Sequence, residues 1–67
     1  MITVEVNGKS QQLPPGATLE LLLQQLALTG KRLAVELNLE VILRSHYPQR
    51  LLKTGDRIEI VHAIGGG

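Results

Sequence analysis

The 67-residue sequence contains no cysteine and almost no aromatic side chains, because Tyr47 is its only one. Without a thiol the chain forms no disulfide and offers no thiolate to zinc or to a substrate. Any sulfur chemistry would need sulfur from outside. Without aromatic platforms the chain also lacks the usual means of stacking single-stranded bases.

A strong charge of either sign is also missing, since seven Lys and Arg are balanced by six Asp and Glu. The two signs are mixed along the chain, which argues against the clustered basic residues of a nucleic-acid binder. No apolar run approaches the roughly 20 residues of a membrane span. A strand-like pattern that begins at Ile2 leaves no room for a signal peptide. We therefore expect a cytoplasmic protein that binds neither nucleic acid nor membrane.

Aliphatic residues are what the chain has in quantity, within a hydrophobic content of 43%. Residues 2–6 alternate apolar and polar side chains, as half-buried strands do, and Asn7-Gly8 then predicts a type I′ hairpin turn. Residues 9–13 are the polar return strand, which we expect at a sheet edge. Residues 57–62 alternate again, and we expect this last strand to pair with the first in the middle of the sheet.

One helix is predicted after Pro14-Pro15-Gly16, with Thr18 as its N-cap. Its core-facing stripe has helical spacing and comprises Leu19, Leu22, Leu23 and Leu26. Gly30 is expected to close the helix as a left-handed cap.

Between the helix and the last strand the pattern is less regular. We expect strands over 33–37 and 41–43, an irregular segment over 44–48, a return to the core at Leu51-Leu52 and a turn over 53–56. The whole chain, 1–67, is then one α+β domain in which one helix crosses a small mixed sheet.

Single polar residues give no enzyme site, since no Ser-His-Asp set, carboxylate pair, metal cluster or phosphate loop can be assembled. His62 is most simply a solvated strand residue, and His46-Tyr47 is either ordinary loop or a contact patch. Scattered arginines at 44, 50 and 57 could contact an acidic partner, but such arginines usually belong to a solvated face, so we assign them no site.

The sequence ends in Ile64-Gly65-Gly66-Gly67. Glycine has no Cβ, so such a segment can enter a narrow slot and bring a terminal carboxylate close to reactive groups. Frayed or artificially added glycines are the simpler interpretation of such an end. Ile64 could pack in a partner's groove or against its own sheet. We therefore expect a flexible tail over 63–67.

Two stretches then resemble a known family, the sulfur carrier proteins of thiamin biosynthesis (ThiS). They run from Val35 to Ser45 and from Leu52 to Gly67, and the most specific part is Gly55-Asp56-Arg57-Ile58-Glu59-Ile60-Val61 ahead of the glycines. The resemblance covers essentially the whole chain and implies a ubiquitin-like β-grasp fold. The family's minimal ending is Gly-Gly, and here there are three glycines.

The resemblance also implies a role for the tail. Gly67 would be adenylated by an E1-like, ThiF-like adenylyltransferase and converted to a thiocarboxylate with sulfur from a cysteine desulfurase relay. Thiazole synthase (ThiG-like) would then receive the sulfur. Gly66, Gly65 and Ile64 would be recognised in the partners' channels. The carrier itself would be no enzyme and would need no cofactor or metal.

Three alternatives stay open at this point. A molybdopterin synthase small subunit is also a thiocarboxylated β-grasp protein, although such tails tend to carry Pro-Pro before the glycines, whereas this one has His62-Ala63-Ile64. A ubiquitin-like modifier would be joined to lysines of target proteins. A plain interaction module, such as an RNA-associated β-grasp domain, would have an inert tail.

Overall fold

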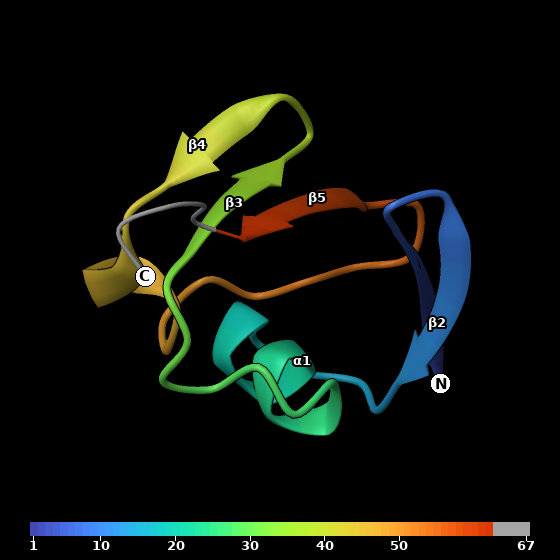
Figure 1. The fold of residues 1–67 in the computed structure, drawn as a ribbon. Helices are drawn as coiled ribbons and strands as arrows, with labels where there is room; N and C mark the ends of the chain where they lie inside the picture. The colour runs from blue at the N-terminus through green and yellow to red at the C-terminus, as the bar shows by residue number, and fades with distance from the viewer. Residues whose placement is uncertain (63–67) are drawn as a thin grey trace.

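The computed structural model describes residues 1–62. Within this range the chain forms five strands, one α-helix and one short 3-10 helix (Figure 1). In chain order they are β1 (Ile2–Val6), β2 (Lys9–Leu13), α1 (Leu19–Gln25), β3 (Leu33–Leu37), β4 (Glu40–Ile42), η1 (Arg44–His46) and β5 (Arg57–His62).

The strands form one mixed sheet in the order β2-β1-β5-β3-β4. Strand β5 lies in the middle, parallel to β1 and antiparallel to β3. The predicted pairing of the first and last strands is therefore confirmed, as is the edge position of residues 9–13. Figure 1 shows α1 packed across one face of this sheet. This arrangement is the ubiquitin-like β-grasp fold.

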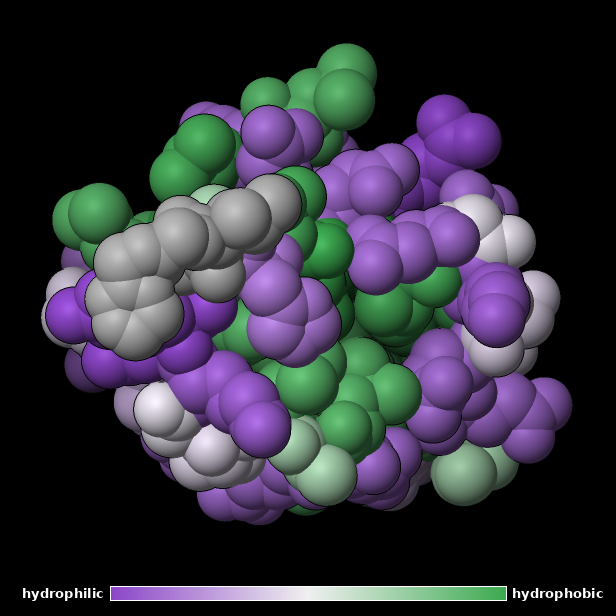
Figure 2. Space-filling model, in the orientation of Figure 1, coloured by the Kyte–Doolittle hydropathy of each residue, from purple (hydrophilic) through white to green (hydrophobic). Residues whose placement is uncertain are grey.

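The core lies between α1 and the sheet and is almost entirely aliphatic. Leu19, Leu22 and Leu23 of α1 are buried in one cluster with side chains from all five strands and from the loop that precedes β5. Those partners include Val4, Leu13, Val35, Leu37, Ile42, Leu52, Ile58 and Ile60. In the view of Figure 2, hydrophobic side chains also reach the surface in the middle of the molecule, where hydrophilic side chains surround them.

Both hairpins turn through two consecutive residues with positive φ, as type I′ turns require. In the first hairpin these are Asn7 (φ 49°) and Gly8 (φ 83°), as the sequence predicted. In the second they are Asn38 (φ 52°) and Leu39 (φ 71°). Leucine is unusual there, because its Cβ disfavours the left-handed region. The side chain of Leu39 is 91% exposed, so burial does not offset this cost.

Helix α1 begins as predicted and ends earlier than predicted. The Thr18 hydroxyl accepts a hydrogen bond from the Leu21 N–H at 3.2 Å, which confirms the N-cap. The prediction of Gly30 as the C-terminal cap is wrong. The left-handed residue is Ala27 (φ 59°), whose N–H donates to the Gln24 carbonyl, while the Leu28 N–H donates to the Leu23 carbonyl. These two bonds form a Schellman motif.

The motif stops the helix at Gln25 because Leu28 must turn back toward the core. Gly30 also has positive φ (81°), but it lies in the turn that leads to β3.

Four smaller expectations also need correction. Strand β4 covers residues 40–42, one residue earlier than predicted, and residues 44–46 form a 3-10 helix inside the segment expected to be irregular. Tyr47 is buried in the core, which excludes the contact-patch interpretation for it. Of the pair Leu51-Leu52, only Leu52 is buried. Leu51 is 64% exposed and forms an isolated backbone bridge with Thr18.

The Ala27→Gly variant should be more stable than the natural chain. Glycine removes the steric penalty of a left-handed alanine while the two capping hydrogen bonds stay in place, so we expect a gain of about 0.5–1 kcal/mol. Urea unfolding measures this difference. The matched control is Gly30→Ala, which introduces the same penalty into a turn with open space around it and should lower stability. Equal stability of Ala27→Gly and the natural chain would contradict the assignment of Ala27 as the cap.

Candidate functional site

The residues that the sequence nominates for function, Ile64, Gly65, Gly66 and Gly67, lie outside the described residues. What the structure describes is their support, namely β5 and its surroundings. Strand β5 ends at His62, so the predicted tail starts directly from it. The way in which β5 is held therefore determines how firmly the tail is rooted.

Strand β5 is anchored by strands on both sides. Along β3 it pairs over five residues, from Leu37 opposite Ile58 to Leu33 opposite His62. Along β1 the ladder is much shorter, with only Glu5 opposite Arg57 and Val6 opposite Ile58. Because β1 turns away at Asn7, the second half of β5 would be left without backbone partners on that side.

The side chain of Asn7 fills this gap. Its Oδ1 accepts from the Ile60 N–H at 2.8 Å, and its Nδ2 donates to the Ile60 carbonyl at 3.2 Å. The Asn7 N–H also donates to the Ile58 carbonyl at 2.9 Å. The carboxamide thus replaces the backbone groups of one more strand residue. It extends the hydrogen bonding between β1 and β5 by two residues, from Ile58 to Ile60.

Asn38 holds the opposite end of β5 from the β3 side in the same way. Its Oδ1 accepts from the Arg57 N–H at 3.0 Å, and its own N–H donates to the Arg57 carbonyl at 2.8 Å. Its Nδ2 donates to Asp56 Oδ1 at 3.0 Å. Asp56 is only 4% exposed and also accepts from the Lys53 N–H at 2.8 Å, so this buried carboxylate is hydrogen-bonded through both oxygens.

Two hollows adjoin the end of β5. One, of about 240 Å³, has an aliphatic and aromatic floor that includes Leu28, Leu33 and Tyr47, and Lys31 and Arg44 lie at it. The other, of about 310 Å³, lies between the first hairpin and the segment after α1 and includes Asn7 and His62. His62 is exposed and lines the second hollow, and its pairing partner Leu33 lines the first.

Charged groups form one ion pair among the described residues. Arg57 Nε lies 3.5 Å from Glu5 Oε2, and the two side chains are 75% and 45% exposed, so the pair contributes little to stability. Residues 1–62 contain no group of three His, Asp or Glu side chains placed to bind a metal ion. No helix in this part of the chain is long and apolar enough to cross a membrane.

The site is thus a strand fixed in the centre of a sheet that leads into a glycine-rich ending. Comparison with known proteins identifies the family of this chain. Residues 4–67 match the model of the ThiS family. The chain belongs to the ThiS family. The resemblance drawn from Val35–Ser45 and Leu52–Gly67 is therefore confirmed.

A solved structure supports the same assignment. The crystal structure of the thiamine biosynthesis protein ThiS from Geobacter metallireducens superimposes with a TM-score of 0.83 at 30% identity. The match covers 98% of this chain and 100% of that one. The β-grasp fold expected from the sequence is thereby confirmed.

Two curated relatives are much longer than this chain. The thiazole synthase of Paramagnetospirillum magneticum is 40% identical over 62 residues, which are 92% of this chain and 19% of that protein. The thiazole synthase of Magnetococcus marinus is 41% identical over 64 residues, or 96% of this chain and 20% of that protein. This chain therefore spans about a fifth of the length of these relatives.

The two asparagine clamps were missed by sequence reasoning. Asn7 was recognised only as a turn residue, and Asn38 only as a residue between the strands predicted over 33–37 and 41–43. Their common signal is an asparagine at the first position of a two-residue hairpin turn, where a left-handed backbone turns the side chain back along the neighbouring strand. The sequence could not show that β5 would occupy that neighbouring position.

Removing the Asn7 carboxamide should loosen the end of β5 next to the tail. Asn7→Gly keeps a residue suited to positive φ, so the hairpin turn survives while the two side-chain bonds to Ile60 are lost. We expect a loss of about 1–3 kcal/mol and faster hydrogen exchange of the Ile60 amide, followed by NMR.

Asn7→Asp is the matched control for the donor. It keeps an acceptor for the Ile60 N–H but places a carboxylate oxygen against the Ile60 carbonyl, so it too should weaken β5. Unchanged exchange at Ile60 in both variants would refute the clamp.

Proposed function

We propose that this chain is the sulfur carrier of thiamin biosynthesis and that the carboxylate of Gly67 carries the sulfur. The family match that runs through Gly67 is the observation that supports this most strongly. In this proposal the chain acts as one domain in the cytoplasm, catalyses no step itself and needs no cofactor of its own.

The chemistry starts from a carboxylate, which is a poor acyl donor because its leaving group would be oxide. An E1-like adenylyltransferase joins the Gly67 carboxylate to AMP and releases pyrophosphate from ATP. A persulfide, loaded by a cysteine desulfurase relay, then displaces AMP and forms an acyl disulfide. A thiol cleaves its S–S bond, leaving a thiocarboxylate on Gly67 and a disulfide on the relay.

The thiocarboxylate is a better nucleophile than the original carboxylate. It delivers its sulfur to the thiazole ring formed by thiazole synthase. Two thiazole synthases contain a stretch similar to this chain, which supports that enzyme as the acceptor. Gly65 and Gly66 pass through the narrow channels of the partners because they have no side chain, and Ile64 is recognised at the entrance.

The absence of cysteine and the anchoring of β5 are both compatible with this role. No internal thiol competes for the activated acyl group. The clamps of Asn7 and Asn38 hold the strand from which the tail leaves, so the partner receives a tail with a defined starting point.

Intact mass measured after incubation with the adenylyltransferase, ATP and a sulfur donor tests the proposal. We expect a gain that corresponds to one oxygen replaced by sulfur, mapped to Gly67 by fragmentation. The matched control is the chain with one alanine added after Gly67, which keeps the fold but moves the carboxylate away from the position of attack. Full conversion of the extended chain, or no conversion of the natural chain by an enzyme active on another carrier, would refute the proposal.

A further inference from the structure

Four exposed cationic side chains that are spread along the sequence come together near the end of β5. Lys31 and Arg32 directly precede β3, Arg44 begins η1, and Arg50 follows it. We call these four residues the basic collar. The sequence alone gave Arg44 and Arg50 no site, because scattered arginines usually belong to a solvated face.

One direct contact joins Arg44 to Lys31, the neighbour of Arg32, and a backbone bond places the segment of Arg50 against the same short helix. Arg44 Nη2 donates to the Lys31 carbonyl at 2.7 Å, and both residues lie at the same hollow of about 240 Å³. The Arg50 N–H donates to the carbonyl of His46, the last residue of η1, at 3.0 Å. The segment that carries Arg50 is therefore folded back on the short helix that carries Arg44.

The collar lies at the root of the tail. Leu33 pairs with His62, the last described residue of β5, and Arg32 is the residue before Leu33. A partner that takes up the residues after His62 must therefore approach this end of the molecule.

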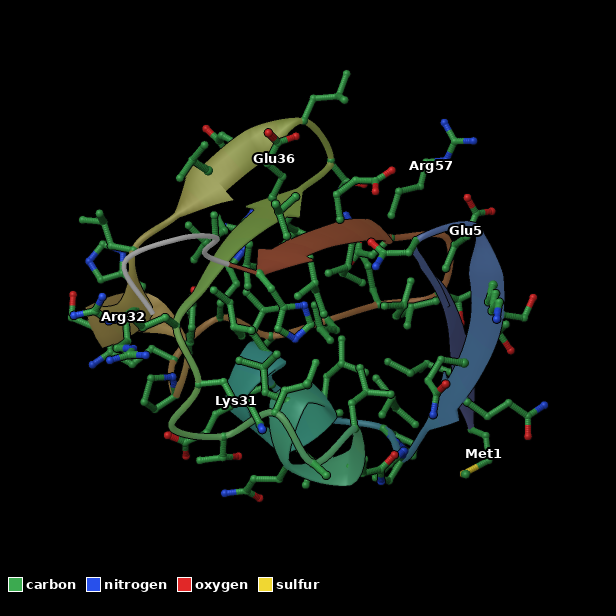
Figure 3. All side chains as sticks on the ribbon, viewed as in Figure 1. Met1, Glu5, Lys31, Arg32, Glu36 and Arg57 are labelled. Atoms are coloured by element: carbon green, nitrogen blue, oxygen red, sulfur yellow. The ribbon has the colours of Figure 1, made fainter. Side chains whose placement is uncertain are left out.

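Most of the acidic residues lie elsewhere. Glu36 and Glu59 stand opposite each other on β3 and β5, and Glu5 pairs with Arg57 at the start of β5. Figure 3 shows Glu5, Glu36 and Arg57 along one side of the molecule, away from Lys31 and Arg32. Glu20, which lies at the hollow with Lys31 and Arg44, is the exception. A chain with almost no net charge thus has a positive end where its tail begins.

We propose that the basic collar docks on an acidic rim around the active-site entrance of the enzyme that adenylates the tail. This inference rests on the proposed function. A carrier must meet its enzyme in every cycle, and complementary charge around the entrance raises the rate of encounter and orients the tail toward it. A protein surface is favoured over a nucleic acid, because no exposed aromatic side chain stands among the four cations.

The test compares two triple charge reversals in the complete chain. The collar variant is Lys31→Glu/Arg32→Glu/Arg50→Glu. It keeps Arg44, because that guanidinium holds the Lys31 carbonyl. The control variant is Lys9→Glu/Lys53→Glu/Arg57→Glu, which reverses the three cations outside the collar. Each replaces three positive charges by three negative ones, so the two have the same net charge. Circular dichroism and urea unfolding establish that both are folded.

The readout is carrier-dependent exchange of pyrophosphate into ATP by the adenylyltransferase. We expect the collar variant to raise the KM for the carrier by about tenfold or more at low salt, with kcat nearly unchanged, because charge on a rim acts on encounter. The difference should shrink as salt is raised to about 1 M, where the Debye length falls to about 3 Å. The control variant should stay within about twofold of the natural chain.

A conservative variant, Lys31→Arg/Arg32→Lys/Arg50→Lys, keeps all three charges and should keep the natural KM. If the collar variant does not fold, the three glutamines in place of the three glutamates give the same test with a smaller effect.

Several outcomes would overturn the proposal. These are an unchanged KM in the collar variant, an equal rise in both reversals, or a loss confined to kcat. The natural chain could also bind RNA or anionic vesicles. If the collar variant lost that binding while its KM stayed unchanged, the collar would be a binding site for that partner and not for the adenylyltransferase. No exchange with the natural chain, by an enzyme active on another carrier, would refute the proposed function itself. Exchange that the collar does not affect would refute this inference alone.

Discussion

The parallel pairing of β1 with β5 is the constraint on which the rest of the structure depends. It joins the two ends of the described chain in the middle of the sheet, so every other element must be arranged around it. The backbone ladder between the two strands spans only two residue pairs, and the Asn7 carboxamide extends it to Ile60. A turn residue therefore also completes the central strand. This economy suits a short chain, which has little core to spare.

In the proposed function, the fold serves to present the end of the chain to partner enzymes. The described residues hold β5 in the centre of the sheet, and cationic residues lie on segments near its end. The two asparagine clamps act on opposite sides of β5, one near its start and one near its end, so the strand is fixed along most of its length. Membership of the ThiS family and the similarity to a stretch of two thiazole synthases support the proposal that this arrangement delivers an activated chain end to a partner enzyme.

Local patterns predicted the elements well where one physical signal dominated. Alternation over residues 2–6 and 57–62, Asn7-Gly8 and the Thr18 cap all depend on neighbours within a few residues, and all are confirmed. The predictions failed where the tertiary structure decided between local alternatives. Gly30 is the better left-handed residue, but Leu28 must return to the core, so the helix ends at Gln25 and Ala27 takes the left-handed conformation. Tyr47 lies in a polar segment and is nevertheless drawn into the aliphatic core.

The sequence by itself determined the class of fold, the pairing of the terminal strands and the family, because periodicity, turn chemistry and the glycine ending are written in consecutive residues. Only the tertiary structure decided the partners of Asn7, Asn38 and Asp56 and the gathering of Lys31, Arg32, Arg44 and Arg50. Hydrogen bonds and charge clusters between distant segments depend on how strands are ordered in space. The pattern of consecutive residues does not show which distant segments become neighbours. They become neighbours only when β5 lies between β1 and β3 in the sheet.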